Sequence, residues 1–417
     1  MLYDATVLLS GTTKNSNRSG VFFTALNIFK CMTDSIPVTL YCKKSDTEDL
    51  KNLLSEFDIS NVGFYAYDNI IFTLNRHYER IKLKINKLGE DRQYFRKLYY
   101  QIIILGLFPF HIFMKNDIFI KKYNCFFSAI YEIPREIAEN KGIKKFTMLH
   151  DVIPLVLQEE EYNPDLWFIK LINSLNGNDY YICNSEYTKQ DFLKHIPVID
   201  KNKIYTSLLA CNEKFRPQPA SVIKKSREKY NIPEKYVFCI GNIEPRKNLE
   251  RIIRTFIKFI SEYKINDLSL VISGTSWTDM LEKLKTAFSD ERYKDKIIFT
   301  GYIDDEDTAP LYSGALFSVY TSMYEGFGLP VLEAMSSGCP VVASKSTSIP
   351  EVAGDCAISV DYDSDEQHIE AYKTYYFNEN IREENRQKGL SRAKMFSWKK
   401  CTDNIIKVMK TVSEEKL

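Results

Sequence analysis

The chain of 417 residues lacks the marks of several protein classes. Its nine cysteines form no C-x-x-C pair and no secretory signal opens the sequence, so we expect reduced thiols, with neither disulfides nor a structural zinc site. No run reaches the roughly 18 to 20 apolar residues of a membrane span. The nearest candidate, residues 102–113, is shorter and contains Pro109 and His111. A net charge of only +1 gives no general attraction for nucleic acid. These absences predict a cytoplasmic protein without a nucleic-acid partner.

One segment leaves contact with a membrane open. Residues 76–97 are rich in lysine and arginine, poor in acidic residues and interspersed with isoleucine and leucine. This composition is typical of a solvated, lysine-rich helix and equally of a surface that rests on anionic lipid head groups. The second interpretation would make the protein peripheral at the inner face of a membrane.

The order of apolar segments predicts two α/β domains. Short apolar runs that lead into helical patterns recur along the chain, as in open, doubly wound sheets of parallel strands. In the first series we predict strands at 3–9, 38–41, 125–127, 146–149 and 180–183, with helices at 20–32 and 164–175. In the second we predict strands at 236–240, 268–273, 297–300, 317–320, 340–343 and 357–360, with helices at 249–263, 279–288, 307–313 and 329–336. The domains are residues 1–212 and 213–385, and a helical segment, 386–417, follows with its last helix at 399–410.

Open α/β sheets bind ligands at the carboxyl ends of their strands. Two such domains in tandem form a cleft when these ends face each other. The loops that follow the strands are therefore the places to search for functional side chains.

Residues 324–333, Tyr-Glu-Gly-Phe-Gly-Leu-Pro-Val-Leu-Glu, are the most informative stretch. Gly326 and Gly328 allow backbone conformations that other residues rarely adopt, in a loop that leads into a helix. The main-chain N–H groups at this helix start, including those of Phe327 and Leu329, are suited to binding an anion. Glu325 and Glu333 cannot both contact phosphate, so we interpret them as acceptors for the hydroxyls of a transferred sugar and a ribose. Alternatively, the two carboxylates only complement the dipole of an ordinary helix.

A second motif, Gly-Asn-Ile-Glu-Pro-Arg-Lys-Asn at 241–248, follows the first strand of the second domain. Arg246 and Lys247 at a helix start suit a diphosphate. The planar guanidinium group of arginine and the compact ammonium group of lysine can both stabilise its oxygens. In isolation these two residues would be solvated basic side chains. Together with Glu325 and Glu333 they predict a site for a sugar diphosphate.

Weaker signals complete the predicted site. Gly20 begins a helix whose N–H groups can reach the same phosphates from the first domain. His150 ends a strand and either donates to a sugar hydroxyl near the reacting carbon or is held structurally by Asp151. Ser185 also follows a strand and is predicted mainly to cap the next helix. In the second domain Gly274, Tyr302 and Ile303 belong to strand-end turns where main-chain groups could read a nucleobase, or are ordinary turn residues.

Taken in this order, the motifs resemble those of the retaining nucleotide-sugar glycosyltransferases of family four. The resemblance extends over most of the chain and is most specific from 241 to 360. The E-x7-E pair, Glu325 and Glu333, is the family's hallmark, and His150 and Gly20 match its cleft histidine and its first-loop glycine. The Pro-Arg-Lys-Asn form at 245–248 is similar to that of bacterial transferases, mannosyltransferases among them, that build surface polysaccharides.

The resemblance implies a GT-B fold: two facing Rossmann-like domains, a deep interdomain cleft and a C-terminal helix that packs back toward the first domain. It implies a metal-independent hexosyltransferase that moves a sugar, mannosyl or a related hexose, from a nucleotide-diphosphate donor to a glycan or lipid-linked glycan with retention. It implies no cofactor beyond the donor, slightly favours a GDP-sugar, and gives the catalytic roles to Glu325, His150, Arg246 and Lys247. The sequence offers no D-x-D triplet in a loop that could hold a metal against the diphosphate.

Two departures from the family pattern and two alternatives stay open. Asn242 stands where many members have arginine, so the phosphate contacts depend on Arg246 and Lys247, and residues 67–113 match no motif. The same architecture could also serve a nucleotide-sugar binding protein without turnover, or an epimerase-like or phosphorylase-like enzyme.

Overall fold

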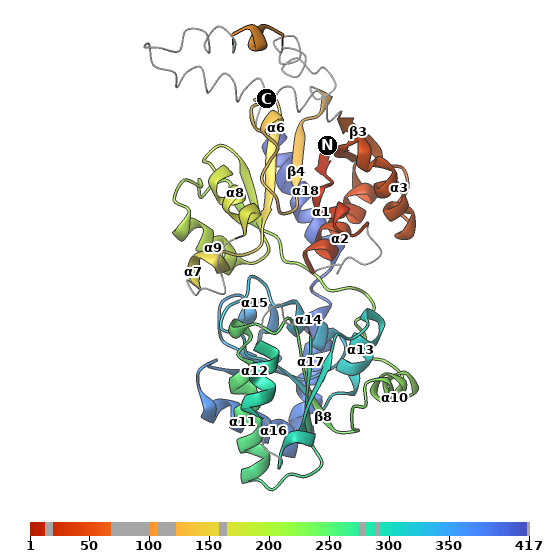
Figure 1. Cartoon of the computed structure of the whole chain (residues 1–417), viewed down its shortest axis with the longest axis vertical. Helices are drawn as coiled ribbons and strands as arrows, with labels where there is room; N and C mark the ends of the chain where they lie inside the picture. Colours follow the sequence, from red (N-terminus) through yellow and green to blue (C-terminus); the bar gives the residue numbers. More distant parts are fainter. Residues whose placement is uncertain are drawn as a thin grey trace.

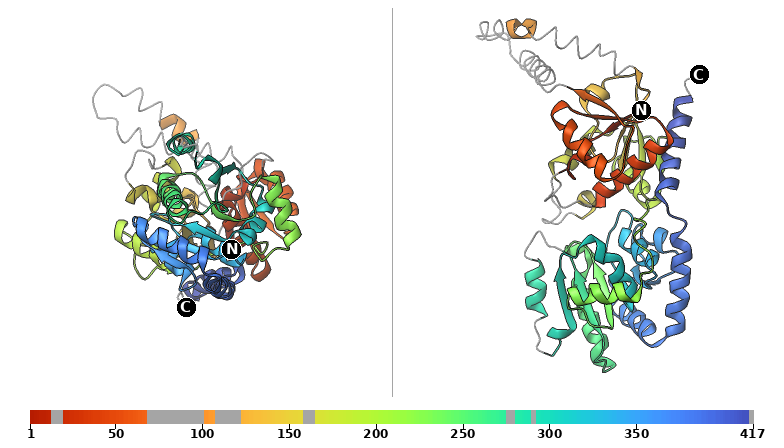
Figure 2. Two further views of the ribbon diagram at one scale, coloured as in Figure 1. Left: turned by 90° about the horizontal axis from the view of Figure 1, so that it is seen from below. Right: turned by 90° about the vertical axis from the view of Figure 1, so that its right-hand side faces the viewer.

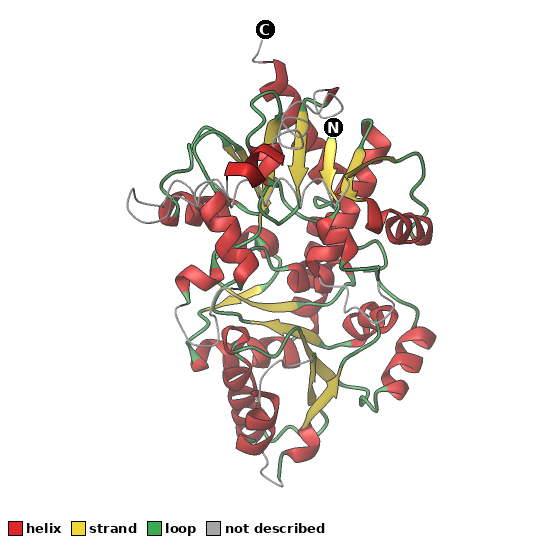
Figure 3. Ribbon diagram, turned by 45° about the horizontal axis from the view of Figure 1, so that its top comes forward, coloured by secondary structure: helices red, strands yellow, loops and turns green. Residues whose placement is uncertain are grey.

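The fold was analysed in a computed structural model, which describes residues 1–12, 20–67, 101–106, 122–157, 165–274, 280–288 and 292–414. Two α/β domains lie one above the other along the long axis of the molecule (Figure 1). Helices flank the strands of both sheets (Figure 3). The fold class predicted from the sequence is confirmed.

The first domain contains a parallel sheet of seven strands in the order β3-β2-β1-β4-β5-β6-β7. Its central strands are almost entirely buried, as expected for a parallel sheet flanked by helices. The strands are β1 (Leu2–Asp4), β2 (Thr39–Lys43), β3 (Gly63–Tyr67), β4 (Cys125–Ser128), β5 (Lys144–Leu149), β6 (Tyr180–Cys183) and β7 (Ile204–Thr206). The helices include α1 (Thr6–Leu9), α2 (Gly20–Ser35), α3 (Thr47–Glu56), α6 (Arg135–Ala138), α7 (Ile153–Val156), α8 (Leu166–Ser174) and α9 (Glu186–His195).

The first predicted strand is only half correct. Strand β1 ends at Asp4, and the rest of the apolar run forms helix α1. The carboxylate of Asp4 accepts hydrogen bonds from both the backbone N–H and the hydroxyl of Thr6, which turns the chain out of the sheet. Strands β3 and β7 were not predicted, because β3 lacks buried residues and β7 has only three residues.

The second domain repeats the arrangement with six parallel strands in the order β10-β9-β8-β11-β12-β13. All six predicted strands are confirmed to within two residues at either end, as β8 (Tyr236–Ile240), β9 (Ser269–Ser273), β10 (Ile297–Gly301), β11 (Phe317–Tyr320), β12 (Val341–Ser344) and β13 (Ile358–Val360). The helices that accompany them include α10 (Ala220–Lys229), α11 (Leu249–Glu262), α12 (Met280–Ala287), α13 (Asp305–Gly314), α14 (Leu329–Ser336), α15 (Ile349–Ala353) and α16 (Asp365–Phe377).

The chain ends by returning to the first domain. Helix α17 (Glu379–Ala393) packs on α14, and the boundary placed after residue 385 lies within α17. Helix α18 (Trp398–Glu414) then packs along α2, and the hydroxyl of Ser207 donates to the carbonyl of Cys401. Figure 2 shows α17 and α18 (blue) running along one side of both domains. The predicted return of the C-terminal helix is therefore confirmed.

Several predictions lie outside the described residues, among them the basic segment 76–97 with its membrane contact. In the part of the chain that the structure describes, no helix is long and apolar enough to cross a bilayer.

Candidate active site

The predicted motifs meet at the carboxyl ends of neighbouring strands. Loop 241–248 follows β8, and loop 321–328 follows β11, which pairs with β8. His150 and Asp151 follow β5 of the other domain. The strand order therefore brings the two motifs of the second domain side by side, as expected for parallel strands.

Glu325 is the centre of a buried cluster of charges. Its Oε1 lies 2.7 Å from Arg246 Nη1 and 2.7 Å from Lys247 Nζ, and the three side chains are only 10 to 12% exposed. Burial on its own would raise the pKa of Glu325, but Lys247 and Arg246 lower it to about 2. Burial lowers the pKa of Lys247, and Glu325 opposes this effect. One carboxylate oxygen thus holds two cations at the predicted phosphate position.

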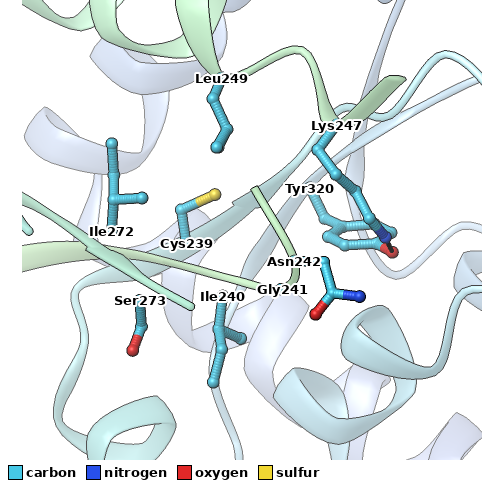
Figure 4. Close-up of a pocket in the computed structure, with 9 residues that line it drawn as sticks. All are labelled: Cys239, Ile240, Gly241, Asn242, Lys247, Leu249, Ile272, Ser273 and Tyr320. Atoms are coloured by element: carbon cyan, nitrogen blue, oxygen red, sulfur yellow. Dashed lines mark hydrogen bonds between the residues drawn. The ribbon is translucent and has the colours of Figure 1, made fainter. Parts of the chain in front are cut away.

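The local sequence explains where the two cations point. Pro245 begins a single 3-10 turn, and Asn248 ends it in the left-handed conformation that asparagine tolerates. The Asn248 amide donates to the carbonyls of Thr321 and Tyr362, which tie this turn to the loops after β11 and β13. Lys247 Nζ also donates to the hydroxyl of Tyr320 at 2.6 Å (Figure 4). In Figure 4, Lys247 and Tyr320 lie with Gly241 and Asn242 around a small cavity of about 10 Å³.

Two hydroxyls hold the main chain of Glu325. The Glu325 N–H donates to Thr347 Oγ1 at 3.0 Å, and Ser348 Oγ donates to the Glu325 carbonyl at 2.8 Å. Both residues lie in the loop after β12, which our sequence analysis did not single out. Their signal in the sequence was a run of hydroxyl residues between a strand and a helix.

The next residue, Gly326, lies in close contact with the first domain. A Cβ at this position would lie 2.1 Å from the carbonyl oxygen of His150. The Gly326 carbonyl accepts hydrogen bonds from Ser185 Oγ at 2.7 Å and Thr188 Oγ1 at 2.9 Å. Ser185 is the N-cap of α9, and Thr188 lies in its first turn. Ser185 also caps α9, as predicted, by accepting from the Thr188 N–H.

Two further carboxylates join the domains around this contact. Glu351 of α15 accepts from the backbone N–H groups of Glu186 and Tyr187, the free donors at the start of α9. The hydroxyl of Tyr324 donates to Asp191 of α9. No local pattern in the sequence indicates these contacts, because each joins residues more than 130 positions apart.

His150 is oriented by the main chain and not by Asp151. Its Nε2 lies 2.8 Å from the carbonyl of Ala129, which can only accept, so a neutral ring carries its hydrogen on Nε2 and leaves Nδ1 as an acceptor. Burial lowers the pKa of His150 and favours this neutral ring. Asp151 instead accepts from the N–H of Ile153. Among the described residues, no hydrogen bond joins Asp151 to His150, and the carbonyl of Ala129 is the contact that holds the ring.

The two predicted helix starts face each other across the cleft. A Cβ at Gly20, the first residue of α2, would lie 4.0 Å from Leu329 Cδ1, the first residue of α14. Gly328 caps α14 with a φ of +103°, a conformation that favours glycine. The N–H groups at the starts of α2 and α14 therefore lie near each other, one set from each domain.

The remaining predicted residues take different positions. Gly274 packs so closely that a Cβ would lie 1.8 Å from the Gly241 carbonyl oxygen, so it lies directly beside the Arg-Lys loop. Tyr302 is exposed, whereas the side chains of Ile303 and Phe327 are buried. Any ligand contact of Ile303 or Phe327 must therefore come from the main chain.

Glu333 differs from Glu325 in having no cation within hydrogen-bonding distance among the described residues. Burial raises its pKa from the ordinary 4.5 to about 7, while Lys214 pulls in the opposite direction. The two glutamates of the motif are thus a paired, ionised carboxylate and a carboxyl that titrates near neutral pH.

Comparison with known proteins agrees with this arrangement. Residues 222–392 match the family of glycosyl transferases group 1. The chain is 31% identical over 289 residues to O-antigen chain mannosyltransferase B of Escherichia coli, covering 67% of this chain and 74% of that one. It is 30% identical to the serotype-specific mannosyltransferase WbdA of Escherichia coli over 52% of this chain, but spans only 27% of WbdA. The crystal structure of Anabaena Alr3699/HepE in complex with UDP and glucose superimposes with a TM-score of 0.67 and 14% identity, covering 98% of this chain and 99% of that one.

Two Rossmann-like domains that face each other in this way define the GT-B fold of glycosyltransferases. The chain belongs to the glycosyl transferases group 1 family, and it is a glycosyltransferase. The resemblance inferred from its motifs is confirmed.

The two glutamates predict different pH profiles of stability. The pKa of Glu333 is raised on folding, so the unfolded state binds fewer protons and stability falls as pH rises from about 4.5 to 7. Relative to wild type, we expect Glu333→Gln to gain about 1 to 3 kcal/mol of unfolding free energy between pH 5 and pH 8. Denaturant unfolding at the two pH values measures this gain.

Glu325→Gln is the matched control. Because the lowered pKa of Glu325 keeps it ionised throughout this range, its stability difference from wild type should be the same at pH 5 and pH 8. Parallel profiles for Glu333→Gln and wild type would contradict the assignment.

Proposed function

We propose that the protein transfers a hexosyl group, mannosyl in the first instance, from a nucleotide-diphosphate sugar to a glycan or lipid-linked glycan during synthesis of a bacterial surface polysaccharide. The observation that carries the proposal is the contact of Glu325 with Arg246 and Lys247 at the cleft between two helix starts. The relatives named for O-antigen mannosyl transfer support the sugar and the acceptor class.

The geometry suits a donor diphosphate between the domains. Arg246, Lys247 and the start of α14 would bind its oxygens, and α2 would add N–H groups from the first domain. Glu325 would then exchange part of its ion pairing for hydroxyl groups of the sugar, and Glu333 would accept from the ribose. Asn242 stands in place of a third cation, so Arg246 and Lys247 carry the phosphate contacts.

The reaction would proceed with retention and without a metal. The bond from the anomeric carbon to the diphosphate oxygen breaks, and a bond to the acceptor oxygen forms on the same face. The acceptor's proton passes to the departing phosphate oxygen. Arg246 and Lys247 stabilise the charge that develops there, each by roughly 3 kcal/mol on the scale of other single charge-stabilising groups. His150 would orient a sugar hydroxyl through Nδ1, because its Nε2 contacts the carbonyl of Ala129.

We further propose a cytoplasmic enzyme that uses a GDP-sugar. The preference for GDP rests on the likeness to mannosyltransferases, and the main chain around Gly274, Tyr302 and Ile303 is the candidate surface for the base. Peripheral contact with a membrane would bring the enzyme to a lipid-linked acceptor.

Removal of the central charges should abolish transfer. We expect Glu325→Ala to lower turnover by about 100-fold or more and Lys247→Ala by at least about tenfold, because each removes a group from the charged centre. Release of nucleoside diphosphate from a panel of nucleotide sugars measures turnover and identifies the donor.

Glu250→Ala is the control, since it removes an exposed carboxylate three positions after Lys247. It should stay within about twofold of wild type. Near-normal turnover of both site variants, with circular dichroism like that of wild type, would refute the assignment. Donor binding without any turnover in wild type would favour the binding-protein alternative.

Independence from metal is tested separately. The arginine and lysine would supply the positive charge that a divalent ion supplies elsewhere, so we expect full activity in excess EDTA. Loss of activity that manganese restores would contradict this part of the mechanism. The anomeric configuration of the product, read by proton NMR in the same reaction, tests retention.

A further inference from the structure

The first domain contains a partly polar cavity of about 780 Å³, far larger than the small cavity beside Lys247 in the second domain. This volume is within the range of small-molecule sites. It lies between the connection from α6 to β5 and the end of α8. The crossover from β4 to β5 contains only the four-residue helix α6, which is too short to cover the sheet face above both strands. The cavity is the space left by this short helix.

The sheet face beneath the cavity changes from apolar to polar along one central strand. Lys145 is the register partner of Phe126 on β4, and Thr147 is the partner of Tyr181 on β6. Phe126 and Tyr181 belong to two separate apolar clusters, whereas Lys145 and Thr147 lie between them and line the cavity. Central strands of a parallel sheet normally have apolar side chains on both faces. Polar side chains at positions 145 and 147 are therefore unusual and indicate a polar ligand or solvent on this face.

The ammonium group of Lys145 has too few partners for its burial. Lys145 is 9% exposed, and among the described residues its only ion pair or hydrogen bond is with Asp179 Oδ1 at 4.0 Å. Burial lowers the pKa of Lys145, with Asp179 opposing. A buried charge normally has close partners, because its transfer from water is costly. The three N–H donors of Lys145 are therefore available to a ligand in the cavity.

The other groups around the cavity indicate what such a ligand carries. Thr147 is buried, and its hydroxyl has no hydrogen-bond partner within the described ranges. Lys141 and Lys144 add positive charge, while Asp179 and Glu139 offer acceptors for hydroxyl hydrogens. Lysine is a common phosphate ligand. The cavity also has more room than inorganic phosphate needs.

We propose that this cavity binds a small hydroxylated phosphate, such as a sugar phosphate, with its phosphate on Lys145 and Thr147 and its hydroxyls toward Asp179. The site is separate from the donor site. Lys145 is near the start of β5 and His150 follows its end, five residues or about 16 Å along the strand. The proposal does not depend on the donor or reaction given above.

Thermal unfolding with added glucose 6-phosphate or inorganic phosphate, at constant ionic strength and with glucose as the uncharged control, tests this site. In wild type we expect glucose 6-phosphate to raise Tm saturably, by about 2 to 4 °C, and glucose to have no effect. Lys145→Met, which removes the ammonium group and keeps an unbranched side chain of similar shape, should weaken this response at least about tenfold.

Two controls separate the cavity from the donor site and from general salt effects. Lys247→Met removes a donor-site cation and should keep the response, as should Lys224→Met, which removes an exposed lysine on α10. Asp179→Ala removes the acceptor proposed for the sugar hydroxyls and should weaken the response to glucose 6-phosphate more than the response to inorganic phosphate, which tests the site even if Lys145→Met fails to fold. No saturable stabilisation of wild type by either phosphate, or an equal response in Lys145→Met, would overturn the proposal.

Discussion

The contact of Gly326 with the first domain is the constraint on which the site depends. The Gly326 main chain lies against the carbonyl of His150, and its own carbonyl accepts two hydroxyl hydrogen bonds from Ser185 and Thr188. Because Glu325 precedes Gly326 directly, the same contact fixes the carboxylate that pairs with both cations. Glu325 and His150, from different domains, are therefore held next to each other at a residue without a side chain, and Glu351 and Asp191 join the domains around it.

Charge at the site is balanced before any ligand binds. Arg246 and Lys247 are buried together, which would be costly without two carboxylates: that of Glu325, which both cations share, and that of Glu244, which lies 2.9 Å from Arg246 Nε. In the proposed reaction, the negatively charged diphosphate of the donor would take over these cations and free Glu325 for hydroxyl groups. Glu333, by contrast, lies within α14 without a close cation among the described residues, and burial raises its pKa to about 7. The E-x7-E pair thus provides two carboxyl groups with different electrostatic environments.

The sequence predicted those residues of the site that lie in loops directly after parallel strands. The positions of Glu325, Arg246 and Lys247 were predictable because each motif follows a parallel strand, and such ends converge at one edge of a sheet. Gly326 was predicted for conformational freedom, but its φ is not in the left-handed region and its role is close approach. Glu351 and Asp191 could not be predicted, since their contacts join distant segments and leave no local pattern. Lys145 was missed for a related reason, because a lysine in an apolar run gives no sign of whether it is buried.

The most direct test of this account is the effect of Gly326→Ala on transfer and on domain arrangement. The added Cβ would lie 2.1 Å from the His150 carbonyl oxygen, so the domains must move apart. Gly106→Ala is the control, because its Cβ would meet no atom within 4 Å. We predict that Gly326→Ala lowers kcat/KM at least about tenfold and increases the radius of gyration in small-angle scattering, while Gly106→Ala changes neither. Wild-type transfer and scattering in Gly326→Ala would contradict the account.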